Sequence, residues 1–244
     1  LITMIAAGRA PDVMVSTWSA GNLGDFPFYR FDRRLAEAAE YPEPVSLLME
    51  NYPYVFPLNI NAYGIAYNKR IFERHGLPTP DELSWNELLS ACSRLAEAGE
   101  TPMRNSQMYS FAFNMIFSLW TDEKGESLMH EWVEREADFA SPQMLTTAWR
   151  VSQLARCFPD RSEQLPFTAV KNHFYNEKDT ALHFTYSSEY LSFAYEDPDI
   201  RFTSFPGDDS SEAGYPLLPL DALAVHENSS ERLESALAFV RFMQ

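Results

Sequence analysis

The chain has 244 residues, 45% of them hydrophobic, so it can bury a sizeable core in one large domain or two small ones. Its formal net charge of −16 argues against nucleic acid or an anionic lipid surface as a partner, because both require a basic face. The only cysteines, Cys92 and Cys157, cannot make a disulfide framework and lack metal-site spacing, so buried free thiols are the favoured interpretation. No apolar run reaches about 18 residues, so the sequence predicts no membrane span.

The first fifty residues give short and separated signals. Residues 11–15, PDVMV, form an apolar run bounded by polar residues, which predicts a buried strand. Helices are predicted over residues 31–39 and 44–52.

The next stretch begins with residues 56–66, which mix apolar side chains with amides and a tyrosine. This pattern predicts an extended segment that leads into a buried strand. Ile71 and Phe72 then begin a helical pattern, which Gly76 and Pro78 end.

Residues 84–99 carry the signals of a complete helix. Ser84 and Glu87 have the spacing of a capping box, and Gly99 is typical of the residue that follows a last helical turn. Further helices are predicted over residues 108–120, 122–135 and 142–157.

Helical and strand patterns alternate in the last third of the chain. A short helix over residues 174–179 is expected to lead into a strand over residues 180–184 and then a polar turn. Two more strands and a last helix are predicted over residues 200–205, 220–225 and 229–243. Helices that alternate with short apolar strands indicate an α/β architecture.

The sequence contains no motif of a hydrolase nucleophile. A GxSxG elbow is absent, and the nearest approximation is a serine pair, Ser187 and Ser188, for which a turn at a strand end is the favoured interpretation. The five histidines show no HExxH spacing, so we expect each at a helix end or on the surface, and we expect neither a metal nor a cofactor. The carboxylate pair of a glycosidase is harder to exclude, because the chain has 35 Asp and Glu residues.

Aromatic side chains set among amides and hydroxyls are the main binding signal. Trp18 follows the first strand, Asn61 and Tyr63 lie in the extended segment, and Tyr186 and Tyr190 flank the serine pair. Aromatic rings stack on the apolar faces of sugar rings, while amides and hydroxyls bind sugar hydroxyls. Core packing is the alternative for every aromatic side chain, and we favour it for two tryptophans on amphipathic helices, Trp85 and Trp149.

Three separated motifs carry a resemblance to a known family: AAGRAPDVMV, then YGIAYNKRIFERHGLPTP with SWNELLSACSRLAEAG, and FYNEKDTALHFTYSSEY. With these motifs the chain resembles the family 1 extracellular solute-binding proteins, the ligand receptors of bacterial ABC importers, over nearly its whole length. In the third motif the family's usual glycine is Lys178 or Asp179, and its methionine is Leu182. The family starts earlier and continues further, so we expect both ends of a longer protein to be missing.

The resemblance implies an α/β, two-lobe, periplasmic-binding-protein-like (type II) fold with hinge crossings and an interlobe ligand cleft. Lobe one would hold residues 1–62 and 206–244, and lobe two residues 63–205. The ligand would be a mono- or oligosaccharide or another small solute, delivered to the membrane permease of an ABC importer without chemical change. Carried over residue by residue, the resemblance implies ligand contacts from Trp18, Asn61, Tyr63, Tyr109, Tyr186, Ser188, Leu220 and Asp221.

We expect a monomer in the periplasm or outside the cell, with a lipid anchor as one option for a missing N-terminal segment. Two alternatives remain beside the importer receptor. One is a glycoside hydrolase that uses a carboxylate pair. The other is a receptor of the same fold that presents its ligand to a sensor kinase.

Overall fold

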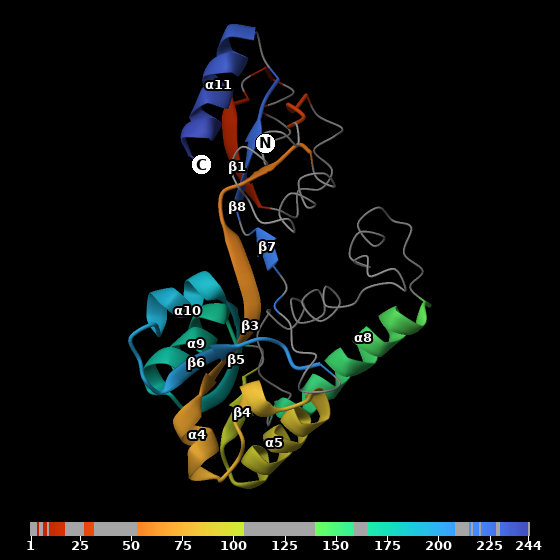
Figure 1. Ribbon diagram of the computed structural model, residues 1–244, viewed down its shortest axis with the longest axis vertical. Helices are drawn as coiled ribbons and strands as arrows, with labels where there is room; N and C mark the ends of the chain where they lie inside the picture. The colour runs from red at the N-terminus through yellow and green to blue at the C-terminus, as the bar shows by residue number, and fades with distance from the viewer. Residues whose placement is uncertain are drawn as a thin grey trace. The chain divides into compact units, whose positions relative to one another are not determined.

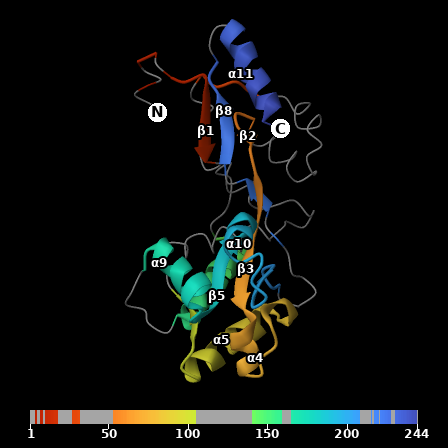
Figure 2. The same cartoon turned by 90° about the vertical axis from the view of Figure 1, so that its left-hand side faces the viewer.

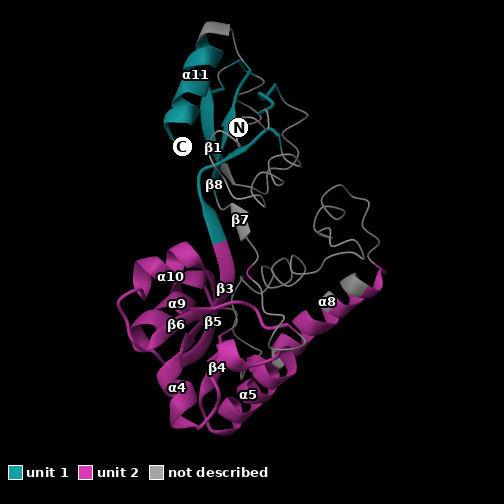
Figure 3. Cartoon of the chain, viewed as in Figure 1, with its two compact units in different colours: residues 1–61, 217–244 teal, residues 62–216 magenta. Residues whose placement is uncertain are grey.

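The computed structural model describes residues 4, 7–8, 10–17, 27–31, 53–104, 140–158, 165–207, 215, 217–219, 221–227 and 230–243. The chain divides into two compact units, unit 1 with residues 1–61 and 217–244, and unit 2 with residues 62–216 (Figure 3). The family resemblance implies lobe boundaries at residues 62 and 206, whereas unit 2 includes residue 62 and residues 206–216. The helices expected over residues 31–39, 44–52, 108–120 and 122–135 lie outside the described residues, apart from Phe31.

Unit 1 is built on a sheet with the strand order β1-β8-β2, formed by β1 (Val13–Thr17), β8 (Asp221–Val225) and β2 (Phe56–Pro57). Both outer strands run antiparallel to β8. The strand expected over residues 11–15 is therefore found two residues later. The strand expected over residues 220–225 is found as β8, and a short strand before it, β7 (Leu217–Pro219), was not predicted.

Apolar side chains pack on both faces of β8, because successive strand residues point to opposite sides. Leu223 and Val225 belong to a core that includes Ala236 and Val240 of α11 (Ser230–Phe242), the expected last helix. Ala222 and Ala224 point to the other face and pack with Phe28 and Val55. Figures 1 and 2 both show α11 beside β8.

Unit 2 contains a sheet with the strand order β4-β5-β3-β6. The strands are β3 (Ile60–Asn68), which enters unit 2 at Ala62, β4 (Thr101–Met103), β5 (Thr180–Tyr186) and β6 (Ile200–Thr203). β5 and β6 run antiparallel to β3, and β4 runs parallel to β5. The nearly unbroken burial of β3 and β5 places them at the centre of the unit.

The helices after β3 begin and end at the predicted signals. α4 (Lys69–Arg74) is capped by Asn68, whose Oδ1 accepts a hydrogen bond from the Arg70 amide, and Gly76 follows with a φ of 59°. A 3₁₀ turn, η2 (Pro80–Glu82), leads to α5 (Trp85–Glu97), which has the expected capping box. The helix predicted over residues 142–157 is confirmed as α8 (Pro142–Gln153) and the 3₁₀ turn η3 (Leu154–Cys157).

The segment around β5 differs from the prediction on both sides. Before β5, the short helix is the end of a longer helical segment, α9 (Phe167–Lys171) and the π-helix η4 (Asn172–Glu177). After β5, the prediction of a polar turn is wrong, because α10 (Ser187–Phe193) begins at once (Figure 2). An acidic first turn, here Glu189, favours a helix start because its charge complements the positive end of the helix dipole.

Two expectations about burial are wrong. Trp85 is 1% exposed, as expected of a core residue, but Trp149 on α8 is 53% exposed. His183, expected at a helix end or on the surface, lies on β5 and is 3% exposed. It is surrounded by aromatic rings, with the ring centroid of Phe174 at 5.3 Å and that of Tyr175 at 5.7 Å.

Candidate ligand-binding site

A polar cluster in unit 1 joins the segment before β3 to the start of β8. The Nδ2 of Asn59 donates to Oδ2 of Asp221 at 3.0 Å, and the Asp221 amide donates to Oδ1 of Asn59 at 3.2 Å. Asn61 donates from Nδ2 to the same Oδ1 at 3.3 Å. Asn61 is buried, Asp221 is half-buried and Asn59 is exposed, so the cluster presents amide and carboxylate groups from a fixed backbone.

A tyrosine pair in unit 2 lies where β3 and β5 meet. Tyr63 and Tyr186 are paired in the antiparallel ladder, with ring centroids 5.8 Å apart. Tyr63 is buried and Tyr186 is half-buried. The Oγ of Ser187 accepts a hydrogen bond from the Ala62 amide at 3.2 Å, which fixes the first residue of α10 to β3. The exposed Ser188 follows directly on that helix.

Glu189 anchors the first turn of α10 from the inside. Its side chain is 1% exposed, and its Oε1 lies 2.9 Å from Nε2 of His183. The hydroxyl of Thr185 donates to the same oxygen at 2.7 Å, and that of Tyr175 at 3.4 Å. On the other side, Nζ of Lys171 lies 3.1 Å from Oε2.

These contacts decide the charge of Glu189. Burial is the largest single influence on its pKa and acts to raise it, but the hydrogen bond and charge of His183, the Thr185 hydroxyl and the charge of Lys171 outweigh it. The pKa of Glu189 is therefore lowered, and a carboxylate is held in the interior of unit 2. Because three elements, α9, η4 and β5, supply these partners, Glu189 fixes the position of Tyr186 and Ser188 beside it.

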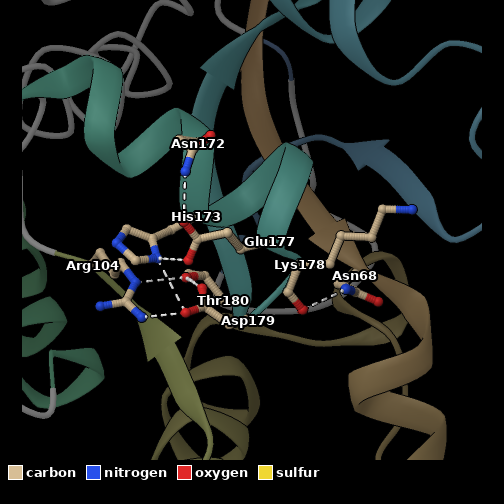
Figure 4. Close-up of polar contacts among 8 residues, drawn as sticks. All are labelled: Asn68, Arg104, Asn172, His173, Glu177, Lys178, Asp179 and Thr180. Atoms are coloured by element: carbon tan, nitrogen blue, oxygen red, sulfur yellow. Dashed lines mark hydrogen bonds and ion pairs between the residues drawn. The ribbon is translucent and has the colours of Figure 1, made fainter.

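A second charged cluster lies at the junction of η4 and β5 (Figure 4). His173, Glu177 and Asp179 each offer one potential metal-ligand atom, and these atoms lie within 4.8 Å of one another. Nδ1 of His173 lies 2.8 Å from Oε2 of Glu177 and 3.1 Å from Oδ2 of Asp179.

Arg104 occupies the cationic position of this cluster. Its Nη2 lies 2.7 Å from the same Oδ2 of Asp179, and its Nε donates to the Thr180 hydroxyl at 3.0 Å (Figure 4). Burial acts to raise the pKa of Asp179, but the hydrogen bonds from Arg104 and Thr180 and the charges of Arg104 and His173 lower it. The guanidinium already balances the carboxylate that a metal would need, so the cluster serves to fix the start of β5.

The whole chain matches the family model described as bacterial extracellular solute-binding protein, from residue 1 to residue 244. The chain belongs to this family. No curated protein matches this solute-binding protein in sequence.

Solved structures share its α/β, two-lobe fold at low sequence identity. One, from work on xylan utilization by Caldanaerobius polysaccharolyticus, has a TM-score of 0.74 and 19% identity, with 99% of this chain and 65% of that chain covered. The solute-binding protein RafE in complex with raffinose has a TM-score of 0.71 and 20% identity, with 100% and 66% covered. An ABC transporter solute-binding protein of Thermotoga lettingae bound with α-D-tagatose has a TM-score of 0.70 and 17% identity, with 100% and 65% covered.

The solute-binding protein thus spans about two thirds of the length of these structures. Among its described residues, none of the helices combines the length and the hydrophobicity that a membrane crossing needs.

The structure brings some of the expected ligand contacts together. Asn61 and Asp221 share the polar cluster of unit 1, and Tyr63, Tyr186 and Ser188 lie together in unit 2. Their role as ligand contacts stays a prediction. The other three, Trp18, Tyr109 and Leu220, lie outside the described residues.

Sequence reasoning missed two residues that organise these groups. Asn59 lies two positions before Asn61 in the same polar stretch, and the alternation of amides along an extended segment is the signal that points to it. Glu189 gave no local signal of its role, because its partners come from α9, η4 and β5.

Proposed function

We propose that this protein binds a carbohydrate outside the cytoplasm and delivers it to the membrane permease of an ABC importer. The observation that carries the proposal is the match of all 244 residues to the extracellular solute-binding family. Similar folds that carry raffinose or tagatose favour a sugar over other small solutes.

The accessible polar groups suit a neutral, hydroxyl-rich ligand. The Asp221 carboxylate accepts hydrogen bonds from sugar hydroxyls, and the Asn59 amide both donates and accepts them. The half-buried ring of Tyr186 offers an apolar face for a sugar ring. An interlobe position for the ligand is the expectation that the family resemblance adds.

Reversible binding needs no covalent step, and one pair of titratable side chains in unit 2 is closed to a substrate. Glu189, which lies beside His183, is 3% exposed as a residue, and so is His183. A substrate therefore does not reach this pair. The Ser187 hydroxyl is fixed as an acceptor from the Ala62 amide. We expect sugars to be recovered chemically unchanged after incubation with the protein.

Isothermal titration of the full-length protein against xylo-oligosaccharides, raffinose, tagatose and simple hexoses tests the proposal. We expect saturable binding of at least one of them. Tyr186→Ala should weaken that binding by roughly 1–3 kcal/mol if the ring stacks on the sugar. Tyr195→Ala is the matched control, because Tyr195 is 69% exposed in the same unit and should leave affinity unchanged.

Two results would contradict the proposal. The first is the absence of heat and of competition with every carbohydrate in the panel at millimolar concentration. The second is release of shorter sugars from an oligosaccharide, abolished by a single Asp or Glu substitution, which would establish the hydrolase instead. The importer role itself is tested by sugar-dependent stimulation of ATP hydrolysis in the cognate permease complex.

A further inference from the structure

The two cysteines of the chain meet in the core of unit 2, although 65 positions separate Cys92 from Cys157 (157 − 92). Cys92 lies on the buried face of α5, and Cys157 is the last residue of η3. These two elements pack against each other, and each cysteine is 0% exposed. The Cys157 thiol lies near enough to that of Cys92 to raise its pKa.

This juxtaposition is not explained by ligand binding. The apolar face of α5 consists of residues such as Leu88 and Leu95, and any small apolar side chain would fill the position of Cys92. Cys157 is the only other cysteine in the 244 residues. Two cysteines can form a disulfide bond, which two aliphatic side chains cannot.

We propose that Cys92 and Cys157 form a structural disulfide bond in the exported protein. The proposal rests on the extracellular location that belongs to the proposed function, because disulfides form and persist in oxidising compartments. Both cysteines are buried on elements that pack against each other, so the proposal requires the two side chains to turn toward each other until the sulfurs are about 2.0 Å apart.

The reaction needs an oxidant, and a protein disulfide of the export compartment is the chemical class that supplies it. One thiol loses its proton and attacks the oxidant disulfide, giving a mixed disulfide and one oxidant thiol. The second cysteine, as its thiolate, displaces the other oxidant sulfur. The S–S bond forms, and the two electrons and two protons lost by the cysteines leave with the oxidant as a dithiol.

Burial fixes the order of events. In the folded dithiol the hydrogen bond to Cys157, together with burial and with the charge of Cys157, holds the pKa of the Cys92 thiol well above its ordinary value. The reactive thiolate is therefore scarce, and no oxidant reaches a side chain that is 0% exposed. Oxidation must take place while the chain folds, so a chain folded in a reducing compartment should keep both thiols.

The test compares full-length protein from two sources, one exported into an oxidising compartment and one made in a reducing cytoplasm. Each sample is denatured in an alkylating reagent without reductant and digested with trypsin. Cys92 falls in the peptide of residues 75–94, and Cys157 in that of residues 157–161. From the exported protein we expect the two peptides as one disulfide-linked species, lighter by two hydrogen atoms than their sum.

From the cytoplasmic protein we expect both peptides alkylated, and still alkylated after the folded protein has been held with oxidised glutathione. A Cys92→Ala variant made by export should release Cys157 for alkylation, and Ser93→Ala serves as its neighbouring control. If either variant fails to fold, the wild-type peptide map alone decides the question.

Exported protein with both cysteines alkylated, or with either one linked to a different cysteine, overturns the proposal. Sugar titration of the same samples separates this outcome from failure of the proposed function. Intact binding with free thiols refutes the disulfide alone. A linked peptide without sugar binding supports the disulfide and refutes the carbohydrate.

Discussion

Gly64 is a glycine at which a Cβ atom would collide with the backbone. A Cβ built there would lie 2.2 Å from the carbonyl oxygen of Thr203 and 3.0 Å from the ring of Phe202, both on the neighbouring strand β6. Backbone in a paired strand cannot move away as a flexible side chain can. We predict that Gly64→Ala lowers the free energy of unfolding by about 3 kcal/mol, measured by urea denaturation.

The control is Gly99→Ala, which adds the same methyl group where no atom lies within 4 Å. Gly99 has a φ of 84°, so this variant suffers only the backbone strain of the left-handed region, about 1 kcal/mol. Equal losses in the two variants would refute the steric explanation for Gly64.

Glu189 predicts a loss of stability in acid. Because its pKa is lowered in the folded protein, the carboxylate contributes stability above its unfolded pKa of about 4.3. That contribution is lost as the pH falls through the lower, folded pKa. Glu189→Gln removes the charge but keeps the shape, and at pH 7 we expect it to lower the free energy of unfolding by about 3 kcal/mol.

Urea denaturation of both proteins from pH 7 down to pH 3 measures this effect. The difference between wild type and Glu189→Gln should shrink toward the acid end, because protonation makes the two side chains alike in charge. Glu196→Gln changes an exposed glutamate on the segment after α10, and it should follow the wild type throughout. A difference that stays constant with pH would refute the role of the charge.

The contrast between Trp85 and Trp149 shows where residue-level prediction fails. Both tryptophans fall on amphipathic helices, and both are expected in the core. In the structure Arg150 is buried instead, with its guanidinium 5.8 Å from the centre of the Trp85 ring, while Trp149 is 53% exposed. A cation that stacks on an indole replaces the expected apolar contact, and hydrophobicity alone does not encode this preference.

The helix α5 owes its start to a capping box that the sequence also predicts. The Ser84 amide and hydroxyl donate to Oε2 of Glu87 at 2.9 and 2.7 Å. Ser84→Ala removes the capping hydroxyl and should lower the free energy of unfolding by about 1 kcal/mol. Ser90→Ala, an exposed site within the same helix, should be neutral or slightly stabilising, because alanine favours the helix interior. Equal effects in the two variants would contradict the capping role.

The link between α5 and η3 makes a further prediction at the level of elements. A disulfide between Cys92 and Cys157 closes a loop of 65 positions (157 − 92), which restricts the unfolded chain. Reduction of the exported protein should therefore lower its free energy of unfolding by roughly 2–4 kcal/mol. Urea denaturation with and without reductant measures the loss, and the Cys92→Ala variant should show no response to reductant.

Helices whose ends are marked by capping residues, glycine or proline were predictable. A cap, a following glycine and a nearby proline suffice to place α4 and α5. The π-helix η4 and the immediate start of α10 were not predictable, because contacts from elsewhere in the chain stabilise them. Glu189 holds α10 through partners on α9, η4 and β5, and the Asn68 side chain donates to the carbonyl of Lys178 after η4 at 3.3 Å (Figure 4).

At the scale of the whole molecule, unit 1 is assembled from both ends of the chain. β1 pairs with β8, so that Val13 lies opposite Val225. No local pattern in the sequence predicts a pairing across such a distance. The family resemblance assigns both the first and the last residues to one lobe, but it did not predict which strands pair. The polar cluster of Asn59 and Asp221 depends on the same long-range assembly, because 162 positions separate the two residues.

Ligand binding to the native state should raise the stability of the whole protein by an amount that its affinity fixes. A ligand at about 100 times its Kd adds about 2.7 kcal/mol when it binds only the folded chain. For a protein of this size, that corresponds to a rise in Tm of about 5–10 °C. We predict this rise for the sugar that calorimetry identifies, and a rise that grows with the logarithm of its concentration. To reach the same rise in Tm, Tyr186→Ala should need a higher sugar concentration, by about the factor by which its Kd increases. Tyr195→Ala should follow the wild type. A rise that is equal for all sugars, including those without calorimetric binding, would point to a general solute effect and contradict a specific site.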